Sequence, residues 1–225
     1  MSNELYKNKY RIKSARLPGW DYRNNAAYFI TINTYKHFHF FGKIENGKSI
    51  LNKNGKITEE YIKLIPKFNL YTQIDIFTVM PNHVHFILTL FNPNKQTADF
   101  VYIDNNAIEN IVNNNCGNVA GRDVAGSRDV AVQRLYNNNN DTADIIDIRK
   151  QMSKISPKSG SVSLMMRTFK YAVKKYIRKK LNIADFDWQE RFHDHIIRNK
   201  HEYRRIYNYI KNNPKNWNND KFNIK

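Results

Sequence analysis

The chain has 225 residues, and its 37 Lys and Arg against 20 Asp and Glu give a formal net charge of +17. This length fits one domain with insertions. A single cysteine, Cys116, excludes a disulfide framework and a cysteine-based zinc site, and is typical of a reducing compartment. No apolar run reaches the ~18 residues of a membrane span, and residues 1–7 are polar and lack a signal-peptide core. We therefore expect a cytoplasmic protein without membrane contact.

The excess of positive charge predicts a polyanionic partner, and nucleic acid is the commonest one. Aromatic residues make up 13% of the chain, with 14 Tyr and 13 Phe. Bases of single-stranded nucleic acid stack on such rings while cations follow the phosphates. A lysine-rich solvated surface, encoded by a genome rich in A and T, is the alternative explanation for part of this charge.

The first half of the chain predicts an arm followed by strands. Residues 1–25 are basic and rich in turn residues, which indicates an extended N-terminal arm. Residues 28–34 are β-branched and aromatic, as in a strand. Residues 41–51 form a predicted hairpin, with a two-residue turn at Asn46-Gly47. Residues 57–68 have helical spacing of apolar residues, although Pro66 should end that helix early.

Two more strands are predicted at residues 73–80 and 83–90, with a tight connection between them. Residues 92–160 contain Asn runs and are long for a loop in a compact domain. We expect an inserted, partly mobile segment that could contact substrate. Residues 161–180 predict an amphipathic helix with a cationic face, which is either solvated or in contact with phosphates. A short strand at residues 192–198 follows.

A pair of histidines lies in the second of these strands. Side chains two residues apart point to the same face of a strand, so His83 and His85 project together. The flanking residues are apolar enough for a central strand buried on both faces. Unpaired polar groups there cost on the order of 2–7 kcal/mol. Either a bound divalent metal or hydrogen bonds from the backbone to two core histidines would satisfy them.

The last predicted helix covers residues 201–213. Its buried stripe includes Ile206 and Ile210, and Tyr209 lies at the edge of this stripe. Asn213 is one turn beyond Tyr209, and Pro214 should stop the helix there, leaving Asn213 at a frayed end. On these grounds alone, an ordinary Asn-Pro helix terminator and an ordinary helix tyrosine are the preferred explanation of these two residues.

Several blocks in a fixed order resemble the single-tyrosine HUH transposases, in particular the branch of REP-associated tyrosine transposases. The blocks are residues 80–85 (MPNHVH), 188–198 (WQERFHDHIIR) and 207–214 (YNYIKNNP), together with 16–22 (RLPGWDY) and the strand at 28–34. The resemblance leaves residues 92–160 unmatched. It implies an α+β fold with a ferredoxin-like antiparallel sheet, helices packed on one face, the histidine pair on a central strand and a long insertion after that strand.

The resemblance also implies roles for individual residues. His83, His85 and Asn213 would hold a divalent cation, Mg²⁺ or Mn²⁺, and Tyr209 would be the nucleophile. A hard cation polarises a phosphate, which a tyrosine with an unperturbed pKa near 10 requires. The expected reaction is cleavage and rejoining of DNA through a 5′-phosphotyrosine, without ATP.

The expected substrate is single-stranded DNA beside a hairpin, and the protein would act as a monomer or a homodimer. The expected DNA-binding residues lie in the arm, on the helix at 161–180 and after the short strand: Arg11, Arg16, Trp20, Tyr22, Lys170, Lys174, Arg178 and Arg198.

Two other functions stay open at this point. One is a hairpin-binding protein without catalysis, and the other is a metal-dependent nuclease that uses water. Tyr207 and Tyr176 are the alternative nucleophiles.

Overall fold

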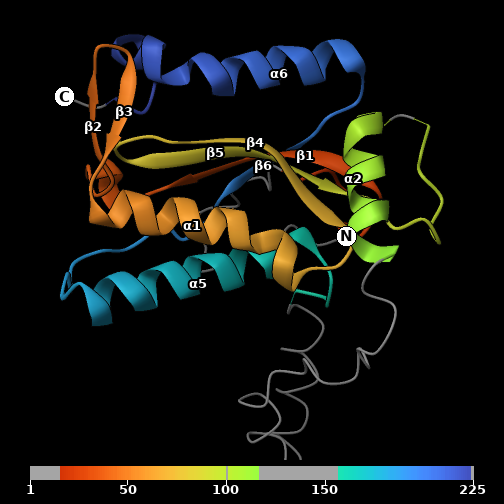
Figure 1. Ribbon diagram of the computed structural model, residues 1–225, viewed down its shortest axis with the longest axis horizontal. Coiled ribbons are helices and arrows are strands. Elements are labelled where there is room, and N and C mark those ends of the chain that lie inside the picture. Colours follow the sequence, from red (N-terminus) through yellow and green to blue (C-terminus); the bar gives the residue numbers. More distant parts are fainter. Residues whose placement is uncertain (1–15, 100, 117–156, 224–225) are drawn as a thin grey trace, which may run out of the picture.

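The computed structural model describes residues 16–99, 101–116 and 157–223 (Figure 1). Its strands are β1 (Ala26–Asn33), β2 (Gly42–Glu45), β3 (Lys48–Leu51), β4 (Thr72–Val79), β5 (His83–Leu90) and β6 (His193–Ile196). Its helices are α1 (Lys53–Phe68), α2 (Asn105–Cys116), α5 (Val162–Lys180) and α6 (Lys200–Asn212), with 3₁₀ turns η2 (Tyr35–His37) and η3 (Asn213–Asn219). None of the described helices is long and apolar enough to span a bilayer.

Four strands form one antiparallel sheet in the order β4-β5-β1-β6, and β2 and β3 form a separate hairpin. The connection from β1 to β4 contains the β2-β3 hairpin and then helix α1, and α5 precedes β6 in the chain. This order of strands and helices is that of a ferredoxin-like sheet. The predicted α+β class is therefore confirmed, with β5, which carries both histidines, at a central position.

The two faces of the sheet carry different helices. Helices α1 and α5 pack side by side on one face, and α6 lies across the other (Figure 1), so the helices are not confined to one face as expected. Val84 and Phe86 belong to the large apolar core with α5, whereas Ile87 packs with Ile206 and Ile210 of α6. Because side chains alternate along a strand, His83 and His85 face the α6 side.

Most of the local predictions are confirmed. Asn46 and Gly47 have φ values of 49° and 69°, as the predicted two-residue turn requires. Ser161 caps α5 by accepting a hydrogen bond from the Leu164 N–H. Pro66 does not end α1 early: it lies in the last turn, where the missing N–H costs a single backbone bond, and the helix continues to Phe68.

The end of α6 differs from the prediction. The α-helix ends at Asn212, and the chain continues directly into η3 with Pro214 in its first turn. Proline is well accommodated there, because its missing N–H has no partner at the start of a helix. Asn213 is 2% exposed, so the expected frayed end is wrong.

Part of the predicted insertion is ordered against the sheet. Helix α2 contacts β4, and the Tyr102 N–H donates to the Ile197 carbonyl. Residues 117–156, on which most of the predicted insertion falls, lie outside the described residues. The same is true of residues 1–15 of the predicted arm.

Strand β4 contains an irregularity that places an acidic side chain on the α6 face. The pairing of β4 with β5 shifts between Ile74 and Ile76, so Asp75 occupies a β-bulge. Its Oδ2 accepts hydrogen bonds from the hydroxyls of Thr89 (2.7 Å) and Tyr203 (3.1 Å). Burial raises the pKa of Asp75 to about 6.

Replacing Asp75 with asparagine is expected to stabilise the protein at neutral pH. A carboxyl whose pKa is higher in the folded than in the unfolded chain stabilises the fold below about pH 4, and this contribution is lost as the pH rises through about 6. A shift of about two pKa units corresponds to about 2–3 kcal/mol. We expect Asp75→Asn to recover about 1–2 kcal/mol of this at pH 7.5. Urea unfolding at pH 5 and pH 7.5 measures it, and a variant less stable than the wild type at pH 7.5 contradicts it.

Candidate metal and nucleophile site

His83 and His85 are buried and are each held by a hydrogen bond through Nδ1. They are 0% and 1% exposed. His83 Nδ1 lies 2.8 Å from Asn82 Oδ1, and His85 Nδ1 lies 2.8 Å from Thr31 Oγ1. The Asn82 amide nitrogen donates to the carbonyls of His37 and Phe222, so its oxygen is the atom that faces His83. His83 Nδ1 therefore carries the proton, and Nε2 keeps a free lone pair.

The Nε2 side of His83 contains polar atoms that lack partners. His83 Nε2 and Asn213 Oδ1 are both buried, and neither has a hydrogen-bond partner among the described residues. Asp220 Oδ2 lies 3.9 Å from His83 Nε2 and accepts a 2.8 Å hydrogen bond from Asn213 Nδ2. Donor atoms of His83, His85 and Asp220 all lie within 4.8 Å of one another. A cation would satisfy these atoms, so the residues fit a metal site.

The electrostatics of the pair suit a metal ligand. Burial lowers the pKa of both His83 and His85, and the nearby Lys221 lowers both further. Both imidazoles are therefore neutral at pH 7, which is the form that coordinates a metal. Two nitrogens combined with carboxylate and amide oxygens form a mixed donor set that could hold a divalent cation.

Asp220 is absent from the residues that the sequence predicts. It reaches the histidines because η3 turns the chain back after Pro214, and the Phe222 N–H fixes its other oxygen at 2.7 Å. The Phe222 ring covers His83, with their centroids 4.8 Å apart. The one signal in the sequence is that Asp220 is the only acidic residue after Glu202.

Tyr209 lies beside this cluster at the edge of α6. Its hydroxyl is 3.2 Å from His85 Nε2, and its ring stands perpendicular to that of Phe29, with centroids 6.0 Å apart. The side chain is 38% exposed, so a large ligand can approach it. Burial raises the pKa of Tyr209 to about 12, the charge of Asp220 adds to this, and Asn213 opposes it. The phenol is therefore protonated at neutral pH, and its hydroxyl lies within hydrogen-bonding distance of His85 Nε2.

The alternative tyrosines occupy other surroundings. Tyr207 stacks on Tyr203, with centroids 6.2 Å apart. Tyr176 contacts Tyr61 between α5 and α1, on the far face of the sheet. Among the tyrosines that the structure describes, the hydroxyl hydrogen-bonded to the histidine pair belongs to Tyr209.

The expected DNA-binding residues of the N-terminal region make structural contacts. Trp20 Nε1 donates to the Tyr28 hydroxyl at 3.1 Å. Tyr22 is 9% exposed and belongs to the large core. Arg16 pairs with the buried Asp194 at 3.3 Å. Arg11 lies outside the described residues.

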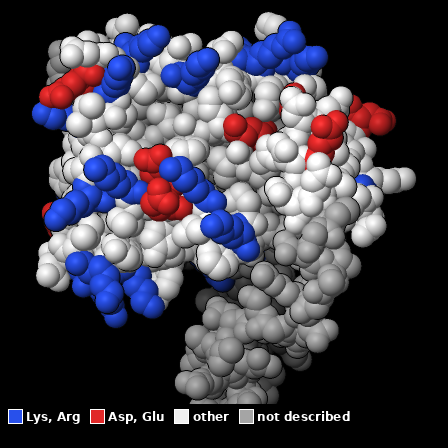
Figure 2. Space-filling view, viewed as in Figure 1, with Lys and Arg blue, Asp and Glu red and all other residues white. Residues whose placement is uncertain are grey.

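The cations of α5 are on the face of the sheet opposite the histidines. Lys170 donates to the carbonyls of Gln189 and Glu190, and Lys174 and Arg178 pair with Asp187. These contacts hold the segment before β6 in place. Arg198 is exposed between β6 and α6. Figure 2 shows Lys and Arg side chains both along the α6 edge and along the α5 edge of this view.

The fold and these contacts define an α+β protein with a ferredoxin-like sheet and a candidate metal site beside a tyrosine. A protein of Haemophilus influenzae described as an uncharacterized protein is 28% identical over 208 residues, which cover 92% of this chain and 91% of that protein. A solved structure described as the REP-associated tyrosine transposase bound to a REP hairpin is similar at a TM-score of 0.43 and 16% identity, over 86% of this chain and 69% of the other. No protein-family model matches the chain.

Proposed function

We propose that the protein is a metal-dependent single-stranded DNA transesterase, a transposase of the single-tyrosine HUH type, which cleaves and rejoins DNA next to a hairpin. The observation that carries the proposal is the position of the Tyr209 hydroxyl, 3.2 Å from His85 Nε2. The same cluster contains His83 Nε2 and Asn213 Oδ1, two buried atoms that have no hydrogen-bond partner in the described part of the chain. A nucleophile and a set of metal ligands thus meet at one place on the sheet.

In this proposal His83, His85 and Asp220 hold Mg²⁺ or Mn²⁺, with the Asn213 oxygen beside them. The ion, when bound, would polarise the scissile phosphate and neutralise its developing charge. Asn82 and Thr31 keep the two imidazoles in the orientation that directs Nε2 toward the ion. Phe29 fixes the ring of Tyr209 from the side.

Tyr209 is the attacking group. Its oxygen forms a bond to phosphorus, the bond from phosphorus to the 3′ oxygen breaks, and the 3′ hydroxyl leaves with a proton. The phenolic proton passes to solvent. The product is a 5′-phosphotyrosine that conserves the energy of the ester, so a later attack by a 3′ hydroxyl rejoins the strand without ATP.

The net charge of +17 supports a nucleic-acid substrate. Two of the residues expected to contact DNA, Arg16 and Arg198, lie at the β6 edge of the sheet. The side chain of Arg198 is exposed and that of Arg16 is partly exposed. Lys170, Lys174 and Arg178 would meet phosphates only from the opposite face.

The test is a cleavage assay on hairpin oligonucleotides with single-stranded flanks, in Mn²⁺ and separately in EDTA. A 3′-labelled strand should migrate with the denatured protein only in Mn²⁺, and a 5′-labelled strand should be shortened without attachment. Binding without any cleavage would favour the hairpin-binding protein. Cleavage with both labels free of protein would favour the nuclease that uses water.

A further inference from the structure

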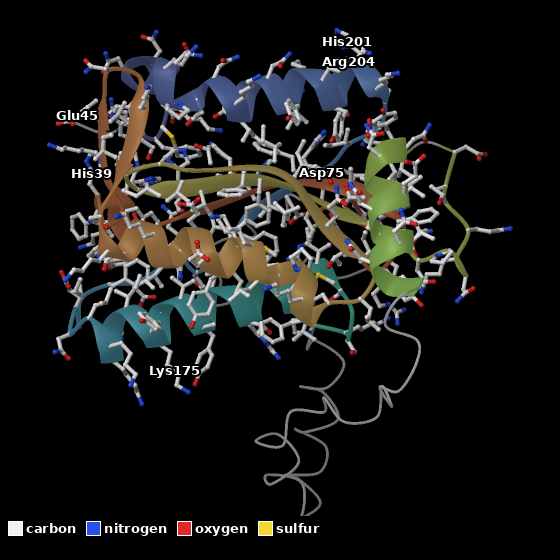
Figure 3. The ribbon with its side chains drawn as sticks, in the orientation of Figure 1. His39, Glu45, Asp75, Lys175, His201 and Arg204 are labelled. Carbon is white, nitrogen blue, oxygen red and sulfur yellow. The ribbon has the colours of Figure 1, made fainter. Side chains whose placement is uncertain are left out.

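A cavity lies between α6, α2 and β4, away from the histidines. Its volume is about 670 Å³, and its lining includes Asp75, Asp104, Tyr203 and Arg204. In Figure 3 Asp75 lies on the sheet near α2, and Arg204 lies on α6 above it. None of these residues takes part in the proposed cleavage.

The inner wall of the cavity provides hydrogen-bond acceptors. Asp75 Oδ2 already accepts from Thr89 and Tyr203, whereas its Oδ1 is buried and has no partner among the described residues. Asp104 accepts from the Tyr102 hydroxyl at 3.2 Å and from the Asn106 N–H at 3.1 Å. Each carboxylate has further lone pairs, so a ligand with several N–H donors suits this wall.

Aromatic rings form another part of the lining. Tyr102 and Tyr203 are 5.3 Å apart between centroids, and Tyr203 and Tyr207 are stacked at 6.2 Å with an angle of 29° between their planes. The hydrogen bond to Asp75 fixes the middle ring of the three. Half-buried, oriented rings of this kind are stacking surfaces for a flat ligand.

The outer part of the lining is cationic. Lys200 and Arg204 are exposed residues of α6 that line the same cavity. The carboxylates of the inner wall on their own would suit a metal cation. The positive charges of Lys200 and Arg204 beside them disfavour such a ligand. The lining therefore matches a nucleotide. Its base would lie inside, against the carboxylates and the tyrosine rings, and its phosphate would lie near the cations at the rim.

We infer that this cavity binds one unstacked guanine base of the DNA strand, with the carboxylates of Asp75 and Asp104 facing its N–H edge. Guanine presents two adjacent donor groups, N1–H and the N2 amine, whereas each other base presents a single one on that edge. The inference rests on the proposed single-stranded DNA substrate. Tyr203 and Tyr209 are six residues apart on α6, about 9 Å along its axis, so one short strand can reach both sites.

The test is binding of fluorescent dT12 oligonucleotides, measured by anisotropy in EDTA so that no cleavage occurs. The full chain should bind dT12 with one central dG about tenfold more tightly than dT12 alone, and more tightly than the same oligomer with a central dA or dC. Equal binding of all four oligonucleotides would overturn the inference.

Three variants locate the preference. Asp75→Asn should keep its binding of dT12 and lose the preference for dG, with a melting temperature no lower than that of the wild type. Arg204→Ala should weaken the binding of all four oligonucleotides to the same extent and keep the preference for dG, because it removes a phosphate contact that does not depend on the base. Glu60→Gln, which removes a charge from the exposed part of α1, should change neither. A preference that survives in Asp75→Asn would overturn the inference.

These outcomes are separable from the proposed function. A dG preference that depends on Asp75 supports the guanine site even if the cleavage assay forms no phosphotyrosine. Adduct formation with a preference unaffected by Asp75→Asn overturns the guanine site and leaves the transesterase standing.

Discussion

Replacing Tyr209 with phenylalanine is expected to abolish formation of the covalent protein–DNA adduct, with a loss on the order of 10³-fold or more. The variant lacks the one atom that the proposal assigns to attack on phosphorus. The ring remains, and with it the contacts to Phe29 and His85. The lost hydrogen bond to His85 belongs to a partly exposed side chain and costs at most about 1 kcal/mol of folding stability. A denaturing gel of the 3′-labelled hairpin oligonucleotide measures the adduct.

Tyr207→Phe is the matched control, because Tyr207 lies on the same helix and its ring stacks away from the histidines on Tyr203. This variant should form the adduct at the wild-type level. If the adduct persists in Tyr209→Phe and disappears in Tyr207→Phe, the nucleophile is Tyr207 and the assignment to Tyr209 is wrong. Both variants should bind hairpin DNA as the wild type does.

The second large effect is expected at Asp220. Asp220→Asn should lower the affinity for Mn²⁺ by about 10²-fold, because the charged oxygen nearest His83 Nε2 is replaced by a neutral amide of the same shape. His83→Ala should lower it at least as far. Isothermal titration with Mn²⁺ at pH 7.5 measures both affinities, and the adduct yield at limiting Mn²⁺ should fall in parallel.

Glu190→Gln removes an exposed carboxylate on the segment before β6 and should bind Mn²⁺ as the wild type does. An unchanged affinity in Asp220→Asn, combined with a loss in His83→Ala, would restore the ligand set of two histidines and Asn213 without the aspartate. A wild-type chain that binds no Mn²⁺ would contradict the metal site altogether.

Much of the sheet could be predicted because its signals are local. The apolar and β-branched runs of β1 and β5 and the Asn46-Gly47 turn each depend on neighbouring residues alone. The period of two also predicts that His83 and His85 share a face. The structure adds that this face is the one covered by α6. The apolar stripe of α6 predicts that the helix packs on the sheet but does not specify which face it covers.

The remaining parts of the site depend on contacts between distant residues. Asp220 reaches His83 only because η3 continues the chain after Pro214, where the sequence predicts a stop. Asn213 is buried for the same reason. The approach of Tyr209 to His85 joins residues 124 positions apart, and helical spacing alone leaves it undetermined. The resemblance to a known family predicted the pair.

The DNA-binding role expected for the cations of α5 stays a prediction, and the structure shows contacts that the sequence of the helix does not reveal. Lys174 and Arg178 have the spacing of a phosphate-binding face, but Asp187 lies within reach of both. A pattern of charges on one helix does not reveal the acidic partner that a later loop supplies.

The most direct measurement is mass spectrometry of the trapped adduct after digestion with trypsin and nuclease. Cleavage after Arg205 and Lys211 gives a peptide with two tyrosines, Tyr207 and Tyr209, and fragmentation separates them. The proposal predicts a 5′-nucleotide on Tyr209, formed in Mn²⁺ and absent in EDTA. A nucleotide on another residue, or a cleaved strand with no modified peptide, would contradict it.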